Sequence, residues 1–294
     1  MMQADSPLIG VDGGGTSCRV ALVRSGQSRQ EVTGGPANVT SDFDGAIATI
    51  LDLIGNLLRD GDGAMMHIHL GLAGVTGTGM ANRVQVAILE RHPGAVVRAT
   101  GDQVTMAAGA LGAADGAVAG IGTGSFVARQ SSGQVSSVGG RGLVLGDQAS
   151  GGWLGLRLLQ EVMLIHDGLR GPTGLGDEIL SDHGHDPARV IGFARDARPV
   201  DFAALAPRII AAAQQGDRLA QDLLNEGADY IARALGILGW RADEPLCLAG
   251  GLGPAYAPYL APALQACLRP AQGNALDGAL YLAGTLAKAA GRAA

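Results

Sequence analysis

The chain has 294 residues, which is enough for a sizeable core and for about two domains of average size. Hydrophobic residues make up 47% of the sequence and aromatic residues 3%, a composition that excludes a largely disordered chain and is typical of closely packed α/β proteins. The net charge of −6, without any block of Lys or Arg, argues against a nucleic-acid-binding surface.

The cysteines and the hydropathy pattern indicate the compartment. Cys18, Cys247 and Cys267 are scattered and form no C-x-x-C pair, which favours reduced thiols over a disulfide framework or a zinc site. The first residues lack the charged and apolar regions of a signal peptide, and no apolar run reaches the roughly 18 residues of a membrane helix. We therefore expect a cytoplasmic protein that binds neither membrane nor nucleic acid.

Two stretches of the sequence resemble each other. Pro7 to Gly35 and Gly116 to Gly140 each contain an apolar run, a Gly/Thr/Ser turn, a second apolar run, a Ser-Gly-Gln turn and a third run that ends in Gly-Gly. Alternation and turn residues predict a three-stranded antiparallel meander in each stretch. The chain therefore consists of two related halves.

The remaining elements alternate helices with strands. Ser41 is the expected N-cap of the first helix, which shows apolar residues at helical spacing. In the first half the predicted elements are a helix at Asp42–Arg59, a strand at His67–Leu72, a helix around Met80–Arg91, a strand at Ala95–Thr100 and a helix at Val104–Leu111. The second half continues with a mostly helical stretch at Gly151–Leu238, a strand at Pro245–Ala249 and a helix at Asn274–Ala290. The fold class is α/β.

The turn in the first meander has the composition of a phosphate-binding site. It follows Asp12 and consists of Gly13, Gly14, Gly15, Thr16 and Ser17. Glycine amides approach an anion closely because no Cβ intervenes, and the two hydroxyls add donors. Asp12 would repel phosphate, so we expect it to hold Mg²⁺, directly or through water.

The second meander repeats this chemistry without the acid. Its turn consists of Gly122, Thr123, Gly124 and Ser125, and Gly250 and Gly251 follow the strand at Pro245–Ala249. A single turn of this kind is equally well explained as a tight hairpin connection, and the late glycines as a turn under a packed helix. The duplication favours two turns that hold successive phosphates of one nucleotide. No P-loop sequence is present.

These residues resemble a known family. D-G-G-G-T, G-T-G-S, T-G-D-Q, the stretch GGRGLVLGDQASG and a late A-G-G are similar to the sugar kinase, heat-shock-70 and actin ATPase superfamily. More narrowly, VDGGGTSCR, GDQASGGWLGLRLLQ and LDGALYLAG resemble glucosamine and N-acetylglucosamine kinases of the BadF/BadG ATPase group over nearly the whole chain.

The resemblance implies an architecture and a catalytic base. It implies two ribonuclease H-like, actin-like ATPase domains with a cleft between them: residues 1–114, completed by a helix at 276–294, and residues 115–275. In such kinases the acid at the position of Asp102 takes the proton from the sugar hydroxyl that attacks ATP. From the residues alone, the favoured role of Asp102 is the N-cap of the following helix, because Asp is a common cap.

Further residues match sugar and nucleotide contacts of these kinases. The sugar-binding positions of these kinases correspond to Asn38, Asp147 and the stretch Gly140, Arg141 and Gly142. In that stretch N-acetylglucosamine kinases tend to carry Gly-Trp-Gly, so Arg141 resembles the glucosamine enzymes instead. Exposed Asx turns are the alternative for Asn38 and Asp147. Ala213 begins a stretch that resembles a contact with the nucleotide base, although a helix end closed by Gly216 explains it as well.

The expected function is ATP- and Mg²⁺-dependent phosphorylation of an amino sugar, glucosamine or N-acetylglucosamine, at its 6-hydroxyl, and the chain could form a homodimer. Two alternatives share the fold. An ATPase activator of a dehydratase would need cysteines that hold an iron–sulfur cluster, and a non-catalytic sugar sensor would need a DNA-binding extension.

Overall fold

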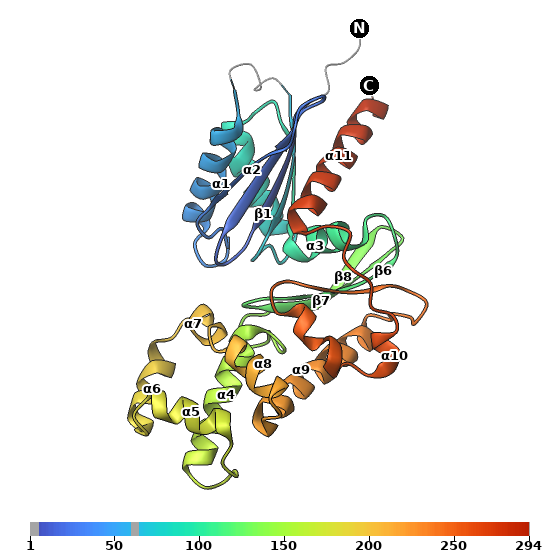
Figure 1. The fold of residues 1–294 in the computed structure, drawn as a ribbon. Coiled ribbons are helices and arrows are strands. Elements are labelled where there is room, and N and C mark those ends of the chain that lie inside the picture. The colour runs from blue at the N-terminus through green and yellow to red at the C-terminus, as the bar shows by residue number, and fades with distance from the viewer. Residues whose placement is uncertain (1–5, 60–64, 294) are drawn as a thin grey trace. The chain divides into compact units, whose positions relative to one another are not determined.

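A computed structural model describes residues 6–59 and 65–293 of the chain. The chain divides into two compact units. The first unit comprises residues 1–114, 130–135 and 271–294, and the second comprises residues 115–129 and 136–270. Each unit is built around one β-sheet with helices packed on it (Figure 1).

The sheet of the first unit mixes antiparallel and parallel strands. Its strands are β1 (Leu8–Gly13), β2 (Cys18–Val23), β3 (Gln30–Gly34), β4 (His67–Leu72) and β5 (Val96–Gly101), in the order β3-β2-β1-β4-β5. The pairs β1–β2 and β2–β3 are antiparallel, which confirms the predicted meander. The pairs β1–β4 and β4–β5 are parallel, so the carboxyl ends of these three strands lie at one edge of the sheet.

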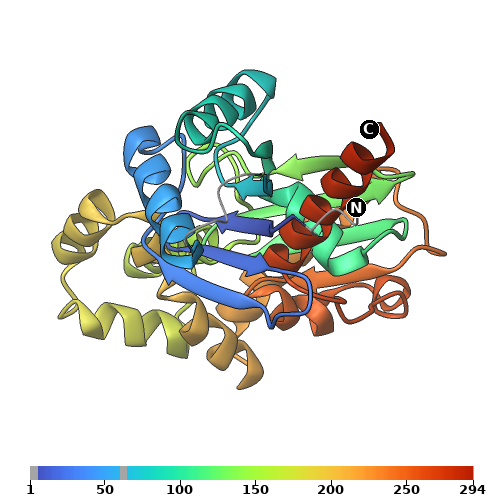
Figure 2. The same ribbon diagram turned by 90° about the horizontal axis from the view of Figure 1, so that it is seen from above.

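Four helices cover this sheet. They are α1 (Phe43–Leu57), α2 (Thr78–Arg91), α3 (Asp102–Leu111) and the C-terminal α11 (Ala275–Ala293). The predicted order β-β-β-α-β-α-β-α is confirmed for the first half. Apolar side chains of β1 such as Ile9 and Val11 belong to the core under α1, and Gly10, which points to the other face, packs against Leu280 of α11. Figure 2 shows the strands from above with α1 and α11 on either side.

The predicted N-cap of α1 is wrong by one residue. The cap is Asp42, whose Oδ1 accepts a hydrogen bond from the Gly45 amide at 3.0 Å. Ser41 lies inside the preceding turn, because its own amide donates to Oδ1 of Asn38 at 3.2 Å. The helix also ends earlier than predicted, at Leu57, since Leu58 is already extended.

The second sheet repeats the first. Its strands are β6 (Gly116–Ile121), β7 (Ser125–Ser131), β8 (Gln134–Gly139) and β9 (Leu246–Ala249), in the order β8-β7-β6-β9 with β9 parallel to β6. This order matches β3-β2-β1-β4, which confirms the internal repeat inferred from the sequence. A fifth strand is reduced to one parallel bridge between Leu246 and Leu268.

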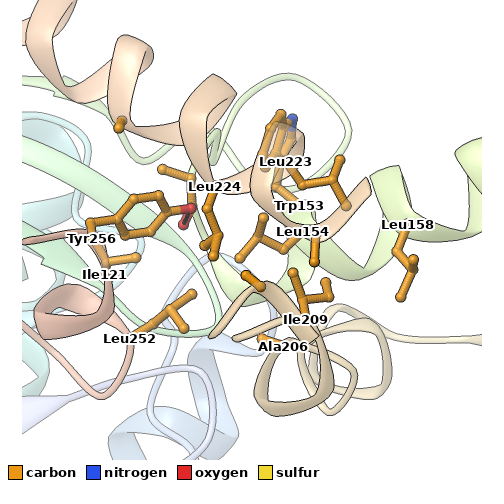
Figure 3. Packing of buried hydrophobic residues seen from close by; sticks show 14 of the residues in the cluster. Ile121, Trp153, Leu154, Leu158, Ala206, Ile209, Leu223, Leu224, Leu252 and Tyr256 are labelled. Carbon is orange, nitrogen blue, oxygen red and sulfur yellow. Dashed lines mark hydrogen bonds between the residues drawn. The ribbon is translucent and has the colours of Figure 1, made fainter. Parts of the chain in front are cut away.

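The stretch between β8 and β9 is helical, as predicted. It contains α4 (Gly151–His166), α5 (Gly174–Asp182), α6 (Pro187–Asp196), α7 (Pro199–Ala203), α8 (Ala206–Gln214) and α9 (Arg218–Ile237), and the 3₁₀ helix η1 (Gly253–Tyr259) and α10 (Pro262–Gln265) follow β9. Their apolar faces enclose one core, in which Leu154 of α4, Leu224 of α9 and Tyr256 of η1 lie close together (Figure 3). None of the helices that the structure describes combines the length and apolar composition needed to cross a bilayer.

The contact between α3 and α11 depends on glycines. A Cβ atom on Gly278 of α11 would collide with the carbonyl oxygen of Thr105 in α3, and one on Gly109 of α3 would collide with that of Asn274. The two helices can therefore approach only because these positions lack side chains. Thr105 in turn lies directly against Gly71 of β4 and is fully buried.

We expect Gly278→Ala to lower the free energy of unfolding by about 1–3 kcal/mol, because the added methyl overpacks the contact between α3 and α11. Urea or thermal denaturation measures the loss. The matched control is Gly284→Ala in the same helix, where a Cβ meets only Leu8 Cδ1 at an ordinary 3.7 Å. This control gains up to about 1 kcal/mol of helix propensity. Equal effects of the two substitutions would contradict the packing argument.

Candidate active site

The first glycine turn connects β1 to β2 and is fixed through its carbonyl groups. The Gly14 amide donates to the Ser17 carbonyl at 2.9 Å, while the carbonyls of Gly13 and Gly14 accept from the amides of Ala73 and Ala37 at 2.8 and 2.9 Å. The amides of Gly15 and Thr16 donate to no group among the described residues. The exposed part of the turn thus presents donors, which is the polarity that an anion requires.

The three glycines of this turn differ in whether the fold requires them. A Cβ atom on Gly13 would lie 2.5 Å from Leu72 Cδ2 and 3.1 Å from Ala37 Cβ, so packing alone demands glycine there. A Cβ on Gly14 would be in ordinary contact, at 3.4 Å from the Ser17 carbonyl oxygen. Gly15 has open space around it and no positive φ. Nothing in the described fold demands glycine at position 15.

Asp12 precedes the turn and pairs with Arg19. The two residues are opposite each other in the β1–β2 register, and Arg19 Nη2 donates to Asp12 Oδ2 at 2.6 Å. Among residues 6–59 and 65–293, no three acidic, histidine or cysteine side chains gather into a metal cage. A single carboxylate fits Mg²⁺, which takes one or two protein carboxylates and completes its shell with waters and substrate phosphates. Asp12 therefore offers its Oδ1 for such an ion.

The second glycine turn, between β6 and β7, rests on the N-terminus of α4. The Gly122 amide donates to the Gly124 carbonyl at 2.9 Å, and the carbonyls of Gly122 and Thr123 accept from the first two amides of α4 at 2.8 and 3.1 Å. Gly122, like Gly15, has open space and no positive φ. Ser125 is only 5% exposed and its hydroxyl donates to the Gln148 carbonyl at 2.5 Å, so this predicted phosphate donor is already engaged.

The glycines after β9 also divide into two kinds. Gly250 has φ of 80°, and a Cβ there would collide with the backbone of Ile121. Gly251 is exposed with nothing near its Cα. The alternative explanation, a turn packed closely on its neighbour, accounts for Gly250 and leaves Gly251 unexplained.

Asp102 is the first residue of α3, directly after the carboxyl end of β5. Its alternative role as N-cap is wrong, because Gly101 occupies the cap position without any side-chain hydrogen bond. The Asp102 carbonyl accepts from the hydroxyl of the buried Thr105 at 3.0 Å, which fixes the first turn of the helix. The side chain is partly exposed, and a carboxylate at this end of a helix is stabilised by the helix dipole.

Asn38 forms the Asx turn that was its alternative explanation. Its Oδ1 accepts from the amides of Thr40 and Ser41 at 2.9 and 3.2 Å. This leaves the Nδ2 amide as the group of Asn38 that can donate to a ligand. The Asx turn and a sugar contact through Nδ2 are therefore compatible.

Asp147 is not in an exposed Asx turn. It is 8% exposed, has φ of 58°, and accepts at Oδ1 from the Gly142 amide at 3.2 Å. A Cβ on Gly124 would lie 2.8 Å from its Oδ2, so the carboxylate lies against the second glycine turn. Burial raises the pKa of Asp147, and backbone donors from Gly142, Ser125 and Arg141 oppose that shift.

Hydrogen bonds to its backbone carbonyl groups hold the loop around Asp147 in place. Three consecutive carbonyl groups, those of Asp147, Gln148 and Ala149, accept from the Ser150 amide at 3.0 Å, the Ser125 hydroxyl at 2.5 Å and the Tyr256 hydroxyl at 2.8 Å. Tyr256 is fully buried and lies more than a hundred residues away in the sequence, so no local pattern indicated its role.

The stretch from Gly140 to Gly142 leads into this loop. Gly140 and Gly142 have φ of 67° and 81°, and the Gly140 amide donates to the Ser125 carbonyl at 2.8 Å. Arg141 between them is exposed. Gly140 and Asp147, two of the predicted sugar-binding residues of the second unit, thus both contact Ser125 of the glycine turn.

Ala213 lies near the end of α8. Its side chain is 3% exposed and belongs to the core of the second unit. Gly216, with φ of 89°, closes the helix end as the alternative explanation required, and the Gly216 amide donates to the Ala213 carbonyl at 3.1 Å. A contact of Ala213 with a nucleotide base stays a prediction.

Known proteins resemble this chain in sequence and in fold. The model of the BadF/BadG/BcrA/BcrD ATPase family matches residues 9–265. Glucosamine kinase GspK from Vibrio cholerae is 33% identical over 283 residues, which cover 94% of this chain and 95% of the relative. A crystal structure of a candidate N-acetylglucosamine kinase from Chromobacterium violaceum superposes with a TM-score of 0.81 at 29% identity, covering 95% of this chain and 99% of the other.

A more distant structure agrees in fold alone. A ROK family glucokinase from Streptomyces griseus, solved with glucose and AMPPNP, gives a TM-score of 0.56 at 17% identity over 96% of this chain and 99% of the other. The predicted α/β fold of the actin-like ATPase superfamily is confirmed. By the extent of the family match and of the curated relative, the chain belongs to the BadF/BadG/BcrA/BcrD ATPase family.

Proposed function

We propose that this protein transfers the γ-phosphoryl group of ATP to the 6-hydroxyl of an amino sugar, with glucosamine preferred. The observation that supports this most directly is the 33% identity to a glucosamine kinase over nearly the full length of both chains. The ATPase family model supports the use of ATP.

We propose that both glycine turns and the glycines after β9 bind the nucleotide phosphates. Support comes from Gly15, Gly122 and Gly251, which have neither a packing neighbour nor a positive φ that would require glycine. In a turn, such a glycine allows a ligand to approach the backbone amides closely. The hydroxyls of Thr16, Ser17 and Thr123 make no hydrogen bond within the described part of the chain and are available to phosphate oxygens.

Mg²⁺, when bound at Asp12, would neutralise charge on the phosphate oxygens. The pairing of Asp12 with Arg19 fixes the orientation of the carboxylate by taking Oδ2. The guanidinium of Arg19 adds a positive charge beside the same turn.

Asp102 is our proposed general base. As the sugar oxygen bonds to the γ-phosphorus, the bond from that phosphorus to the bridging oxygen of ADP breaks, and the hydroxyl proton passes to the Asp102 carboxylate. The position of Asp102 at the end of β5, with its backbone tied to the buried Thr105, holds the carboxylate in a defined place. Phosphoryl transfer depends on positioning and charge stabilisation more than on base strength, so a carboxylate is suitable.

On the sugar, we propose contacts from the Asn38 amide, the Gly140–Gly142 backbone and Asp147. Each offers a defined group: Nδ2 of Asn38, peptide groups fixed by Gly140 and Gly142, and the buried carboxylate of Asp147. We further propose that the enzyme works in the cytoplasm; its assembly as a homodimer stays a prediction.

The cysteines do not support the dehydratase-activator alternative. Cys18 and Cys247 are both buried, and burial raises the pKa of both thiols, that of Cys18 to about 12. Cys267 is partly exposed, and its thiol contacts the carbonyls of Ala242 and Ala263. An iron–sulfur cluster needs accessible thiolates as ligands.

A panel of sugars tests the proposed function. We expect ADP release from ATP and Mg²⁺ to be fastest with glucosamine, slower with N-acetylglucosamine and glucose, and low without sugar. A coupled assay measures ADP, and phosphorus NMR of the product locates the phosphate on C6. ADP release that no sugar stimulates would contradict the proposal.

Asp102→Asn should lower kcat by roughly 100- to 10,000-fold, the range for losing a general base, while a non-hydrolysable ATP analogue still binds. Steady-state kinetics and calorimetry measure the two effects. The control is Asp44→Asn, which removes an exposed carboxylate of the same unit. An Asp102→Asn enzyme with full turnover would remove the base assignment.

Gly15→Ala and Gly122→Ala should each weaken binding of the ATP analogue by roughly 10-fold without lowering Tm, because the new methyl meets no protein atom within 4 Å but stands where phosphate approaches. Gly171→Ala, an equally open loop position, is the control. Unchanged affinity in both variants would place the phosphates elsewhere.

A further inference from the structure

The carboxylate of Asp147 is a fixed and largely dehydrated group of the second unit. Backbone amides of Gly142, Arg141 and Ser125 donate to it, and its Oδ2 fits against Gly124 only because that residue has no Cβ. Its backbone adopts a φ of 58°, which few non-glycine residues tolerate. Every one of these contacts holds the acid in place, and none neutralises its charge.

This distinguishes Asp147 from the other buried acids. Glu161, 7% exposed, pairs with Arg157 at 3.0 Å and Arg170 at 2.8 Å. Glu244, 5% exposed, forms a two-point pair with Arg129 at 2.6 and 2.8 Å. Within the described residues, no Lys, Arg or His lies at ion-pair distance from Asp147. Buried charges are normally paired, so the missing cation points to a ligand.

The charged and titratable neighbours do not supply that cation. Arg141 lies on the same loop, but its guanidinium is exposed and forms no ion pair with any described residue. Tyr230 lies against Gly139, and its pKa is raised, mainly by burial and further by the negative charge of Asp147, with Arg141 and Arg233 opposing. Tyr230 therefore stays neutral.

Resting on the proposed function, we propose that Asp147 binds the protonated 2-amino group of the sugar and makes the kinase select free amino sugars over N-acetylated and neutral ones. An ammonium supplies both the missing charge and hydrogen-bond donors. A hydroxyl or an acetamide N–H donates a hydrogen bond to the carboxylate but leaves its charge uncompensated, whereas an ammonium both donates the hydrogen bond and supplies the opposite charge.

Asp147→Asn tests this assignment. Asn tolerates positive φ and keeps the shape and one acceptor oxygen, so the loop is preserved as far as a substitution allows. We expect the ratio of kcat/KM for glucosamine to that for glucose to fall roughly 10- to 100-fold, mainly through KM for glucosamine. The charge-matched control, Asp167→Asn, removes an exposed acid of the same unit and should leave the ratio unchanged.

The wild-type enzyme gives a second, independent readout. As pH rises and the amine of glucosamine loses its proton, KM for glucosamine should increase relative to KM for glucose, which has no titrating group. This comparison does not depend on how the variant folds.

Three results would overturn the proposal. An equal loss for all sugars in Asp147→Asn would mean that Asp147 binds a hydroxyl common to them. A KM for glucosamine that follows that of glucose across pH would mean that the amine is not recognised by a charge. A wild-type protein that phosphorylates none of the sugars would instead overturn the proposed kinase function, and this inference with it.

Discussion

The candidate site of the second unit depends on how Ser125 ties the loop from Asp147 to Ser150 to the glycine turn. This loop contains two non-glycine residues with positive φ, Asp147 and Ala149, a conformation that costs of order 1 kcal/mol or more at each. The Ser125 hydroxyl, the Tyr256 hydroxyl and the Ser150 amide each satisfy one carbonyl of the loop. A typical hydrogen bond contributes about 1 kcal/mol net, so these bonds together offset the strain and keep a buried carboxylate in one orientation.

The duplicated strand-turn-strand motif has been adapted differently in the two units. In the first, Asp12 and Arg19 form an ion pair beside exposed hydroxyls, and the turn is fixed by amides from neighbouring loops. In the second, the buried Ile121 ends β6, and the turn carbonyls are bound by the first amides of α4. The same backbone arrangement thus provides a turn preceded by a paired acid in one unit and, in the other, a turn coupled to a helix and to Asp147.

The sequence predicted well what depends on local pattern. Apolar alternation and turn glycines placed both meanders, and helical spacing placed α1, since these signals act within a few residues. Residue preference favours Ser41 as N-cap, but its amide donates to the Asn38 side chain and Asp42 caps the helix. The burial of Asp147 and the engagement of Ser125 could not be read from the sequence, because both depend on contacts across 20 or more residues, such as Ser125 with Gln148 and Tyr256 with Ala149.

The closeness of Asp147 to Gly124 has a consequence for the order of binding. If a phosphate binds at the second turn as proposed, its negative charge lies near the buried carboxylate, whose Oδ2 borders Gly124. Two like charges in a poorly solvated place repel each other, whereas a cation on Asp147 cancels this repulsion. Because linkage is reciprocal, an amino sugar would then tighten ATP binding by the same factor by which ATP tightens sugar binding, and a neutral sugar would not. With phosphate and amino sugar bound as proposed, the position of the acid beside the turn would couple sugar choice to nucleotide binding.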